Sequence, residues 1–105
     1  MVLGPDIVFD YNSGSLVGPA ATVNLTPIEG NLLRYLAESR RPIVPRQELL
    51  ERVWQIPYGS GPSHVLRSHV KNLRHKLRRA APGIDLLVTS PGRGYGLRID
   101  SNATD

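Results

Sequence analysis

The pattern of hydrophobic and polar residues changes period along this chain, and it begins with short β-type segments. Residues 7–9 and 22–25 are rich in β-branched and apolar side chains, and turn formers lie between them at residues 12–14 and 18–19. Segments of this kind, punctuated by Asn, Gly and Pro, are typical of antiparallel strands joined by tight turns. We therefore predict a small antiparallel sheet from about residue 5 to about residue 25.

A first helix is predicted directly after this sheet. Thr26 is followed by Pro27 and Glu29, which is the spacing of a capping box with proline at the first helical position. Apolar residues then recur at helical spacing until the sequence approaches Pro42, which ends a helix. Gly30 lies inside this segment and costs about 1 kcal/mol of helix propensity relative to alanine, but the regular spacing still favours a helix.

Two further helices are predicted downstream, with a loop between them. The first extends from about Arg46 to Trp54, with apolar residues on one side and charged residues on the other. Residues 55–63 contain two prolines and two glycines, so they are predicted to form a loop. Ser63 is then a candidate cap for a longer helix that Pro82 ends. The inward positions of that helix are Leu66, Val70, Leu73, Leu77 and Ala80.

The C-terminal residues predict a two-stranded hairpin. Residues 86–89 and 95–99 are the predicted strands, and the glycine-rich sequence Pro-Gly-Arg-Gly at residues 91–94 lies between them. With 105 residues the chain is long enough for one hydrophobic core, so we predict a single domain of the α+β class. Its predicted plan is a sheet at about residues 5–25, three helices at about 26–82 and a hairpin at about 85–100.

The basic residues are concentrated in one part of the chain. No Asp or Glu lies between Glu51 and Asp85, and this window holds seven Lys or Arg residues and all three histidines. The formal net charge is +4, so the seven positive charges of the window leave about −3 for the rest of the chain. A local basic surface of this kind is typical of a protein that binds a polyanion.

The longest predicted helix presents most of these cations to solvent. Its outward face centres on His64, Ser68, Lys71 and His75, with Arg67, Arg74 and Arg78 along one edge and Asn72, Lys76 and Arg79 along the other. A basic helix that follows a short helix and a loop is typical of a helix-turn-helix. In the major groove of DNA, its cations neutralise phosphates while Asn, Ser, Lys or His reach base edges.

An alternative interpretation of this face is a solvated surface with no partner, since exposed helices are often charged. Solvated helices normally mix positive and negative residues, which gain favourable pairs one turn apart. The helix contains no carboxylate, so we expect its cations to lack partners within the chain and to need an external one.

Other classes of function find less support in the sequence. The three histidines do not lie one turn apart on one helix face, and the chain has no cysteine, so we predict no metal site. No catalytic constellation and no glycine-rich phosphate loop is recognisable, so we predict neither an enzyme nor a cofactor. The lack of cysteine, of a signal-like N-terminus and of a long apolar run predicts a cytoplasmic protein without a membrane span.

Several motifs occur in an order that resembles a known family. They are Leu-Thr-Pro-Ile-Glu at residues 25–29, the segments 46–54 and 69–77, and Gly-Arg-Gly-Tyr at residues 92–95. Together they resemble the OmpR/PhoB-type winged-helix effector domain of two-component response regulators. The resemblance implies a winged helix-turn-helix that binds double-stranded DNA at direct-repeat half-sites as a homodimer and regulates transcription. It also implies that the loop 55–63 contacts RNA polymerase.

The resemblance further implies roles for individual residues. Positions that usually touch phosphates are His64, His69, Lys71, Arg74, Trp54, Thr89 and Tyr95, and positions that usually meet bases are Arg67, Ser68 and Asn72. Core packing is the alternative role for Trp54 and for Tyr95. We include His75 and Arg78 in the predicted DNA-binding set because they lie on the same basic helix.

The chain departs from the family pattern at some of these places. Arg67 stands where an acidic residue is usual, Pro91 where the wing arginine is customary, and Pro45 where a hydroxyl cap is common. We therefore assign contact with the minor groove to Arg93, which lies between two glycines at the hairpin tip. Gly30 replaces a common aromatic residue, so we expect the first helix to pack less fully there. The rival function is a winged helix that binds an acidic protein partner.

Overall fold

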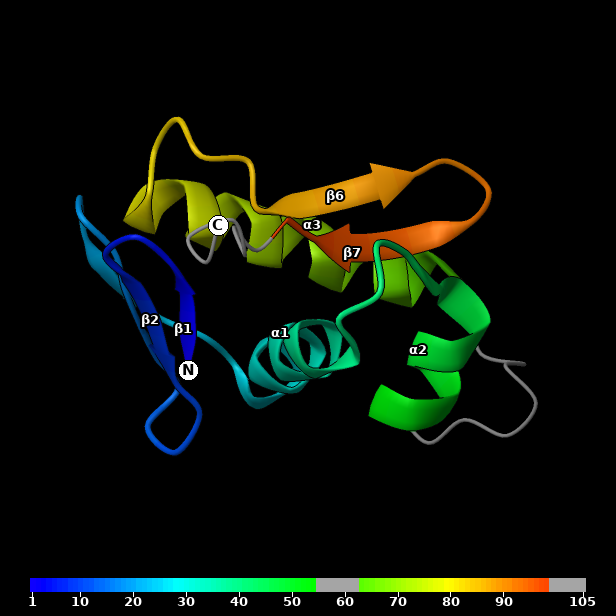
Figure 1. Ribbon diagram of the computed structural model, residues 1–105. Helices are drawn as coiled ribbons and strands as arrows, with labels where there is room; N and C mark the ends of the chain where they lie inside the picture. The colour runs from blue at the N-terminus through cyan, green and yellow to red at the C-terminus, as the bar shows by residue number, and fades with distance from the viewer. Residues whose placement is uncertain (55–62, 99–105) are drawn as a thin grey trace.

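The computed structural model describes residues 1–54 and 63–98, which form an N-terminal sheet, three helices and a second sheet that contains the hairpin (Figure 1). The α+β winged helix-turn-helix predicted from the sequence is confirmed. The elements are β1 (Val2–Gly4), β2 (Ile7–Asp10), β3 (Ser15–Val17), β4 (Thr22–Asn24), α1 (Pro27–Ser39), β5 (Val44–Pro45), α2 (Arg46–Val53), α3 (Ser63–Ala80), β6 (Leu87–Ser90) and β7 (Gly94–Leu97).

The N-terminal sheet is antiparallel, with the strands in the order β1-β2-β3-β4. Side chains alternate between its two faces, so that Ile7 and Phe9 are buried in the core while Val8 is exposed. The sheet begins at Val2, earlier than the predicted start near residue 5. This start was missed because β1 has three residues and turns only Leu3 into the core, which is too short to give an alternating pattern.

The first helix begins with the capping box that the sequence predicts. The Glu29 N–H donates to Thr26 Oγ1 at 3.2 Å, and the Thr26 N–H donates to Glu29 Oε1 at 2.9 Å. Gly30 is buried, and a Cβ at this position would lie 3.1 Å from Cζ of Phe9. The Phe9 ring therefore occupies the space that a larger side chain would need, and a surface hollow of about 530 Å³ lies beside it.

The second sheet contains a strand that the sequence did not reveal. Its order is β5-β7-β6, so β5, the short link between α1 and α2, pairs with the hairpin. A Cβ on Gly94 would lie 2.0 Å from the Val44 carbonyl oxygen, and a Cβ on Gly96 would lie 1.8 Å from that of Pro42. These glycines are needed for the close approach of the two backbones, a role that the sequence did not predict for them.

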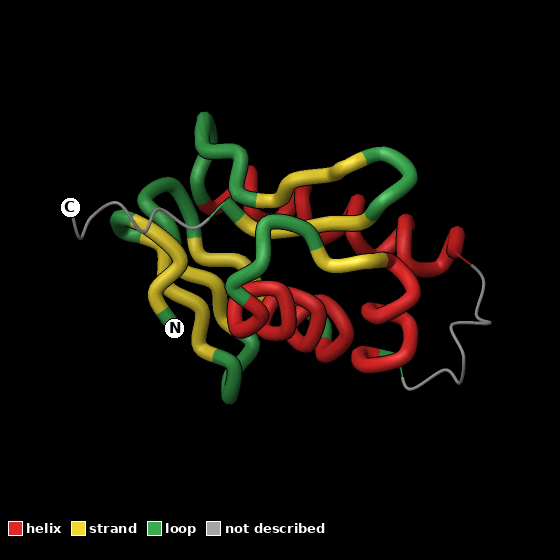
Figure 2. Tube along the Cα trace, turned by 45° about the vertical axis from the view of Figure 1, so that its right-hand side comes forward, coloured by secondary structure: helices red, strands yellow, loops and turns green. Residues whose placement is uncertain are grey.

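The two ends of the molecule are joined by α3. The N-terminal sheet lies at one end and α2 at the other, and α3 lies behind the β6–β7 hairpin (Figures 1 and 2). The predicted inward residues of α3 are all buried. At its C-terminal end, the Ala20 N–H donates to the carbonyl oxygen of Ala80 at 2.9 Å. Because a helix leaves its last carbonyls without partners, this bond caps α3 with the β3–β4 turn.

One predicted boundary differs from the structure, and two predicted segments lie partly outside the described residues. Ser63 is the first residue of α3 rather than the residue before it, a difference of one position that is usual at helix ends. The RNA polymerase contact was predicted on the loop 55–63, of which residues 55–62 and the side chain of Ser63 lie outside the described residues. The end of the hairpin, at residues 99 and 100, lies outside them as well. Within the described part of the chain, no helix combines the length and apolarity needed to span a bilayer.

Candidate nucleic-acid interface

The solvent side of α3 carries the largest group of predicted site residues. We call it the recognition face, and it consists of His64, Arg67, Ser68, Lys71, Asn72 and His75, all of which are exposed. Helical periodicity predicted this exposure because the opposite side holds the apolar stripe. The recognition face therefore presents hydrogen-bond donors and cations, with no carboxylate among its own residues.

The sequence predicted Lys76 along one edge of the outward face, but its side chain is paired with another element. Its Nζ donates to Oε1 of Glu29 at 2.7 Å, and the Glu29 side chain is only 3% exposed. Burial alone raises the pKa of the Glu29 carboxyl, but the bonds from Lys76 and from the Thr26 N–H outweigh it and hold the pKa below its ordinary value. The expectation that Lys76 lacks a partner within the chain is wrong, because folding brings α1 against α3.

Arg78 also has a carboxylate near it. Its Nη2 lies 3.6 Å from Oδ1 of Asp85, and both side chains are more than half exposed. Asp85 closes the acid-free window in the sequence, and the turn after α3 returns it to the helix surface. The positive charge of Arg78 is therefore partly compensated, although an exposed pair at this distance contributes little stability.

Arg74 links α3 to the wing, the β6–β7 hairpin. Its guanidinium donates to the Leu87 carbonyl oxygen at 3.3 Å and to the Thr89 hydroxyl oxygen. The sequence predicted Arg74 and Thr89 as separate phosphate contacts, and the structure brings them together. Arg74 as a whole is half-buried, and its bonds to β6 fix the position of the wing beside the recognition face while its guanidinium supplies charge.

Trp54 and His69 meet on the other side of α3. Their ring centroids are 5.5 Å apart and the rings are tilted by 50°. Both side chains are half-buried, and Trp54 packs against the core. The structure thus supports the packing role of Trp54 and leaves part of its ring at the surface, next to the predicted phosphate position of His69.

The two predicted wing residues differ in exposure. Arg93 is exposed at the hairpin tip, where its N–H donates to the Ser90 carbonyl oxygen at 2.9 Å and Gly92 has a φ of 76°. Tyr95 is only 7% exposed and belongs to the hydrophobic core. Burial favours the core role for the Tyr95 ring, whereas Arg93 is free to meet a ligand.

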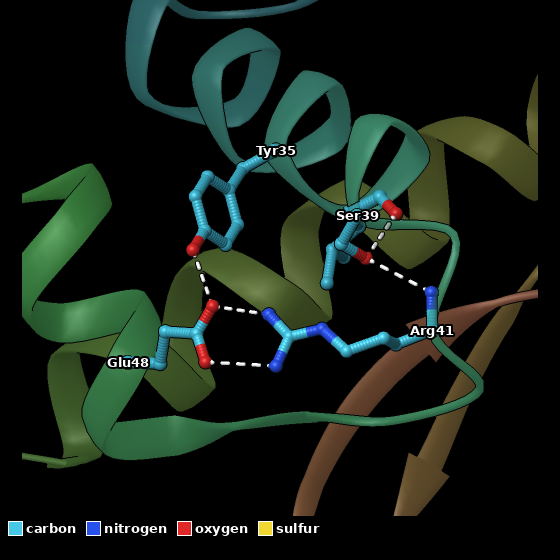
Figure 3. Close-up of polar contacts among 5 residues, drawn as sticks. Tyr35, Ser39, Arg41 and Glu48 are labelled. Carbon is cyan, nitrogen blue, oxygen red and sulfur yellow. Dashed lines mark hydrogen bonds and ion pairs between the residues drawn. The ribbon is translucent and has the colours of Figure 1, made fainter.

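A polar network that the sequence did not predict holds α2 in place (Figure 3). The Arg41 guanidinium donates twice to the Glu48 carboxylate, once at 3.0 Å from Nη1, and the Tyr35 hydroxyl donates to the same group. The bonds from Arg41 and then Tyr35 lower the pKa of Glu48 below its ordinary value. These residues join α1, the link after it and α2, so they position the helix that precedes α3. Their spacing along the sequence gives no signal for this contact.

The histidines do not form part of a metal site in the described part of the chain, where no group of three His, Asp or Glu side chains is placed to hold an ion. The site instead combines an exposed basic helix with a wing fixed beside it. This arrangement offers cations on α3 and at the wing tip, together with the polar side chains of the recognition face. Cations suit the phosphates at the rims of a DNA groove, and polar side chains suit the base edges on its floor.

Comparison with known proteins agrees with this geometry. Residues 20–97 match the family model described as "Transcriptional regulatory protein, C terminal". The transcriptional regulatory protein SrrA of Staphylococcus aureus is 38% identical over 94 residues, which cover 89% of this chain and 39% of SrrA. The chain thus spans about two fifths of the length of this curated relative.

Solved structures give the same fold. The DNA binding domain of CadC from E. coli superposes with a TM-score of 0.80 at 22% identity, covering 93% of this chain and 90% of that one. The DNA binding domain of CpxR from E. coli has a TM-score of 0.70 at 28% identity, covering 88% of this chain and 89% of that one. The chain belongs to the family of C-terminal domains of transcriptional regulatory proteins, of the OmpR/PhoB type.

Proposed function

We propose that this domain binds double-stranded DNA in a sequence-specific manner and regulates transcription. The observation that carries the proposal is the recognition face, an exposed helix surface of donors and cations with the Arg93 wing tip on the same molecule. The family supports it, because it is a family of transcription regulators rather than of enzymes. The CpxR domain, described as DNA-binding, adds a relative at 28% identity.

In the proposed complex α3 enters the major groove. Lys71, His69 and Arg74 contact phosphates on the rims and set the register of the helix, whereas Asn72 and Arg67 reach base edges. Asn suits adenine and Arg suits guanine, because each can make two hydrogen bonds to the edge of that base. The wing then follows the backbone so that Arg93 enters the adjacent minor groove.

The same proposal extends to the longer protein. Since the chain spans 39% of SrrA, we propose that it serves as the output domain of a two-component response regulator in the cytoplasm. Two copies bind direct-repeat half-sites, and the loop that precedes α3 contacts RNA polymerase.

Titration with labelled duplexes at several salt concentrations tests the proposal. A random pool is first used to select a preferred sequence, and affinity is then compared between that sequence and an unselected one. We expect affinity to fall steeply with salt for both duplexes, because phosphate contacts release counterions. We also expect the selected duplex to bind roughly 10³-fold or more tightly than the unselected one.

Failure to bind any duplex at low salt would overturn the proposal and favour the rival function. In that case the recognition face meets an acidic protein partner, to which its cations are equally complementary. Salt-dependent binding without preference for any sequence would contradict the specific part of the proposal alone.

A further inference from the structure

A polar groove lies between the C-terminal half of α3 and the strand β6. Its volume is about 460 Å³, and three residues of β6, an edge strand of its sheet, line one wall. The lining residues are Arg74, Arg78, Asp85, Leu87, Val88, Thr89 and Arg98. The groove is therefore bordered by the helix on one side and by the wing on the other.

Positive charge dominates this groove. Three arginines, Arg74, Arg78 and Arg98, line it together with a single acidic residue, Asp85. Arg74 is held by its bonds to β6, and Arg78 lies one helical turn, about 6 Å, further along the axis of α3. The groove therefore continues the row of cations on α3 towards the end of the helix.

Arg98 adds a cation that sequence patterns did not single out. Its N–H donates to the Leu86 carbonyl oxygen at 2.7 Å, which fixes its backbone at the end of β7. The side chain is exposed, and among residues 1–54 and 63–98 no hydrogen bond or ion pair is found for its guanidinium. An arginine whose backbone is fixed, and whose guanidinium pairs with no described residue, is suited to bind an anion through two parallel hydrogen bonds.

We propose that this groove is a phosphodiester-binding site in which Arg98 and Arg78 hold the DNA backbone beyond the bases contacted by the recognition face. The inference rests on the proposed function and extends it. Continuity supports it, because Arg74 and Thr89 line the groove and also match phosphate-contacting positions. In the proposed complex, the DNA strand that passes between α3 and the wing continues into the groove.

Asp85 acts in this site as a restraint on affinity. Its carboxylate lies 3.6 Å from the Arg78 guanidinium, and it repels a phosphate that approaches the same group. Removal of the Asp85 charge frees Arg78 and strengthens binding, whereas removal of Arg98 weakens it. The two substitutions therefore act with opposite sign at one site.

The test compares variants of these residues with a matched ion pair on another element. Arg98→Gln and Asp85→Asn are the test variants. Arg34→Gln and Glu38→Gln are the controls, because this pair is also exposed, joins at 3.1 Å and lies on α1. Each variant is titrated with a random-sequence duplex at several salt concentrations, since phosphate contacts do not depend on sequence. Thermal unfolding checks that each variant is folded.

We expect R98Q to reduce the slope of log affinity against log salt by about 0.9 for each phosphate that the variant no longer neutralises. We expect D85N to raise affinity several-fold at low salt, and the α1 variants to match the unaltered domain. Equal slopes for R98Q and R34Q, or equal affinities for D85N and E38Q, would overturn the inference. If the unaltered domain binds no duplex, the proposed function and the inference both fail. If it binds duplex and the test variants behave like the controls, only the inference fails.

Discussion

Lys71 and Asn72 are neighbours on α3, and we expect them to make different contributions to binding. Lys71→Ala removes a charge near the phosphates, so affinity should fall on every sequence and the salt slope should decrease by about 0.9. Asn72→Ala removes a side chain that can make two hydrogen bonds to adenine, so it should cost about 1–3 kcal/mol on the selected duplex and little on others. Titration of both variants with both duplexes measures this difference.

An unchanged salt slope for Lys71→Ala would show that this side chain does not meet a phosphate. Equal losses on selected and random duplexes for Asn72→Ala would exclude base recognition at that position. Arg34→Gln again serves as a control, because Arg34 lies on α1 and already pairs with Glu38.

Arg93 is expected to read the shape of the DNA rather than its bases. A narrow minor groove in A·T-rich DNA has an enhanced negative potential, which attracts an inserted arginine. Arg93→Ala should therefore weaken binding more when the flank beside the half-site is A·T-rich than when it is G·C-rich. A footprint without protection of that flank, or equal losses on the two flanks, would contradict insertion of Arg93.

The exposed residues of α3 were predictable because a single helix has one period and one apolar stripe. The partners of Lys76 and Arg78 were not, because ion pairs depend on which segments meet in the fold. Glu29 lies 47 residues before Lys76 in the chain, and no local pattern relates the two. The capping box did predict the position of Glu29, but it could not reveal a second bond to the same carboxylate.

At the level of elements, the Glu29 carboxylate joins the start of α1 to α3. Glu29→Gln should destabilise the domain by about 1.5–3 kcal/mol, because hydrogen bonds to charged groups are worth about that amount. The Thr26 N–H and Lys76 Nζ both donate to Glu29 Oε1, and a glutamine amide oxygen can accept both bonds. The loss therefore reports the negative charge that Glu29 presents to Lys76. Urea unfolding of Glu29→Gln and of the control Glu38→Gln, whose carboxylate is exposed, measures the difference. A loss no larger than that of the control would contradict the assignment.

This pair also gives the domain a defined dependence on pH. The folded-state pKa of Glu29 lies below the ordinary value of 4.5, so the ionised carboxylate stabilises the fold above that pH. The contribution is lost as the pH falls through the lowered pKa. Unfolding free energy should therefore decrease on acidification, and the decrease should be smaller in Glu29→Gln. Glu48, whose pKa is also lowered, keeps its own share of the effect in both proteins.

The contact between β5 and β7 depends on two glycines. Gly96→Ala places a Cβ 1.8 Å from the Pro42 carbonyl oxygen, so the two backbones must separate, at a cost of about 1–3 kcal/mol or more. Gly4→Ala is the control, because its Cβ meets Ile7 at an ordinary 3.7 Å. Thermal unfolding should show a lower Tm for Gly96→Ala alone, and similar values for the two variants would contradict the role of Gly96.

The three helices and the hairpin were predictable from periodicity and from Pro and Gly punctuation. β1 and β5 were not, because strands of two or three residues have too few positions to alternate. The network of Tyr35, Arg41 and Glu48 was not predictable either. Its members meet only when α2 packs beside α1, and no local sequence pattern indicates that contact.

For the whole molecule, we expect two copies to bind neighbouring half-sites. A helix-turn-helix protein reaches the same face of the duplex again after one helical turn, about 10–10.5 base pairs. Affinity should therefore be highest when two selected half-sites are repeated in the same direction at that spacing. Mass measurement of the complex by light scattering should give two chains per duplex. A single bound chain at every spacing would contradict this prediction.

The N-terminal sheet affects where the domain can be cut when it is expressed alone. The family match begins at residue 20, yet the buried Leu3, Ile7, Phe9 and Leu16 come before it. A boundary placed at residue 20 would discard β1, β2 and β3 and open the interior beside α3 to water. The smallest portion worth expressing by itself therefore starts at the first strand, ahead of the point where the family match begins.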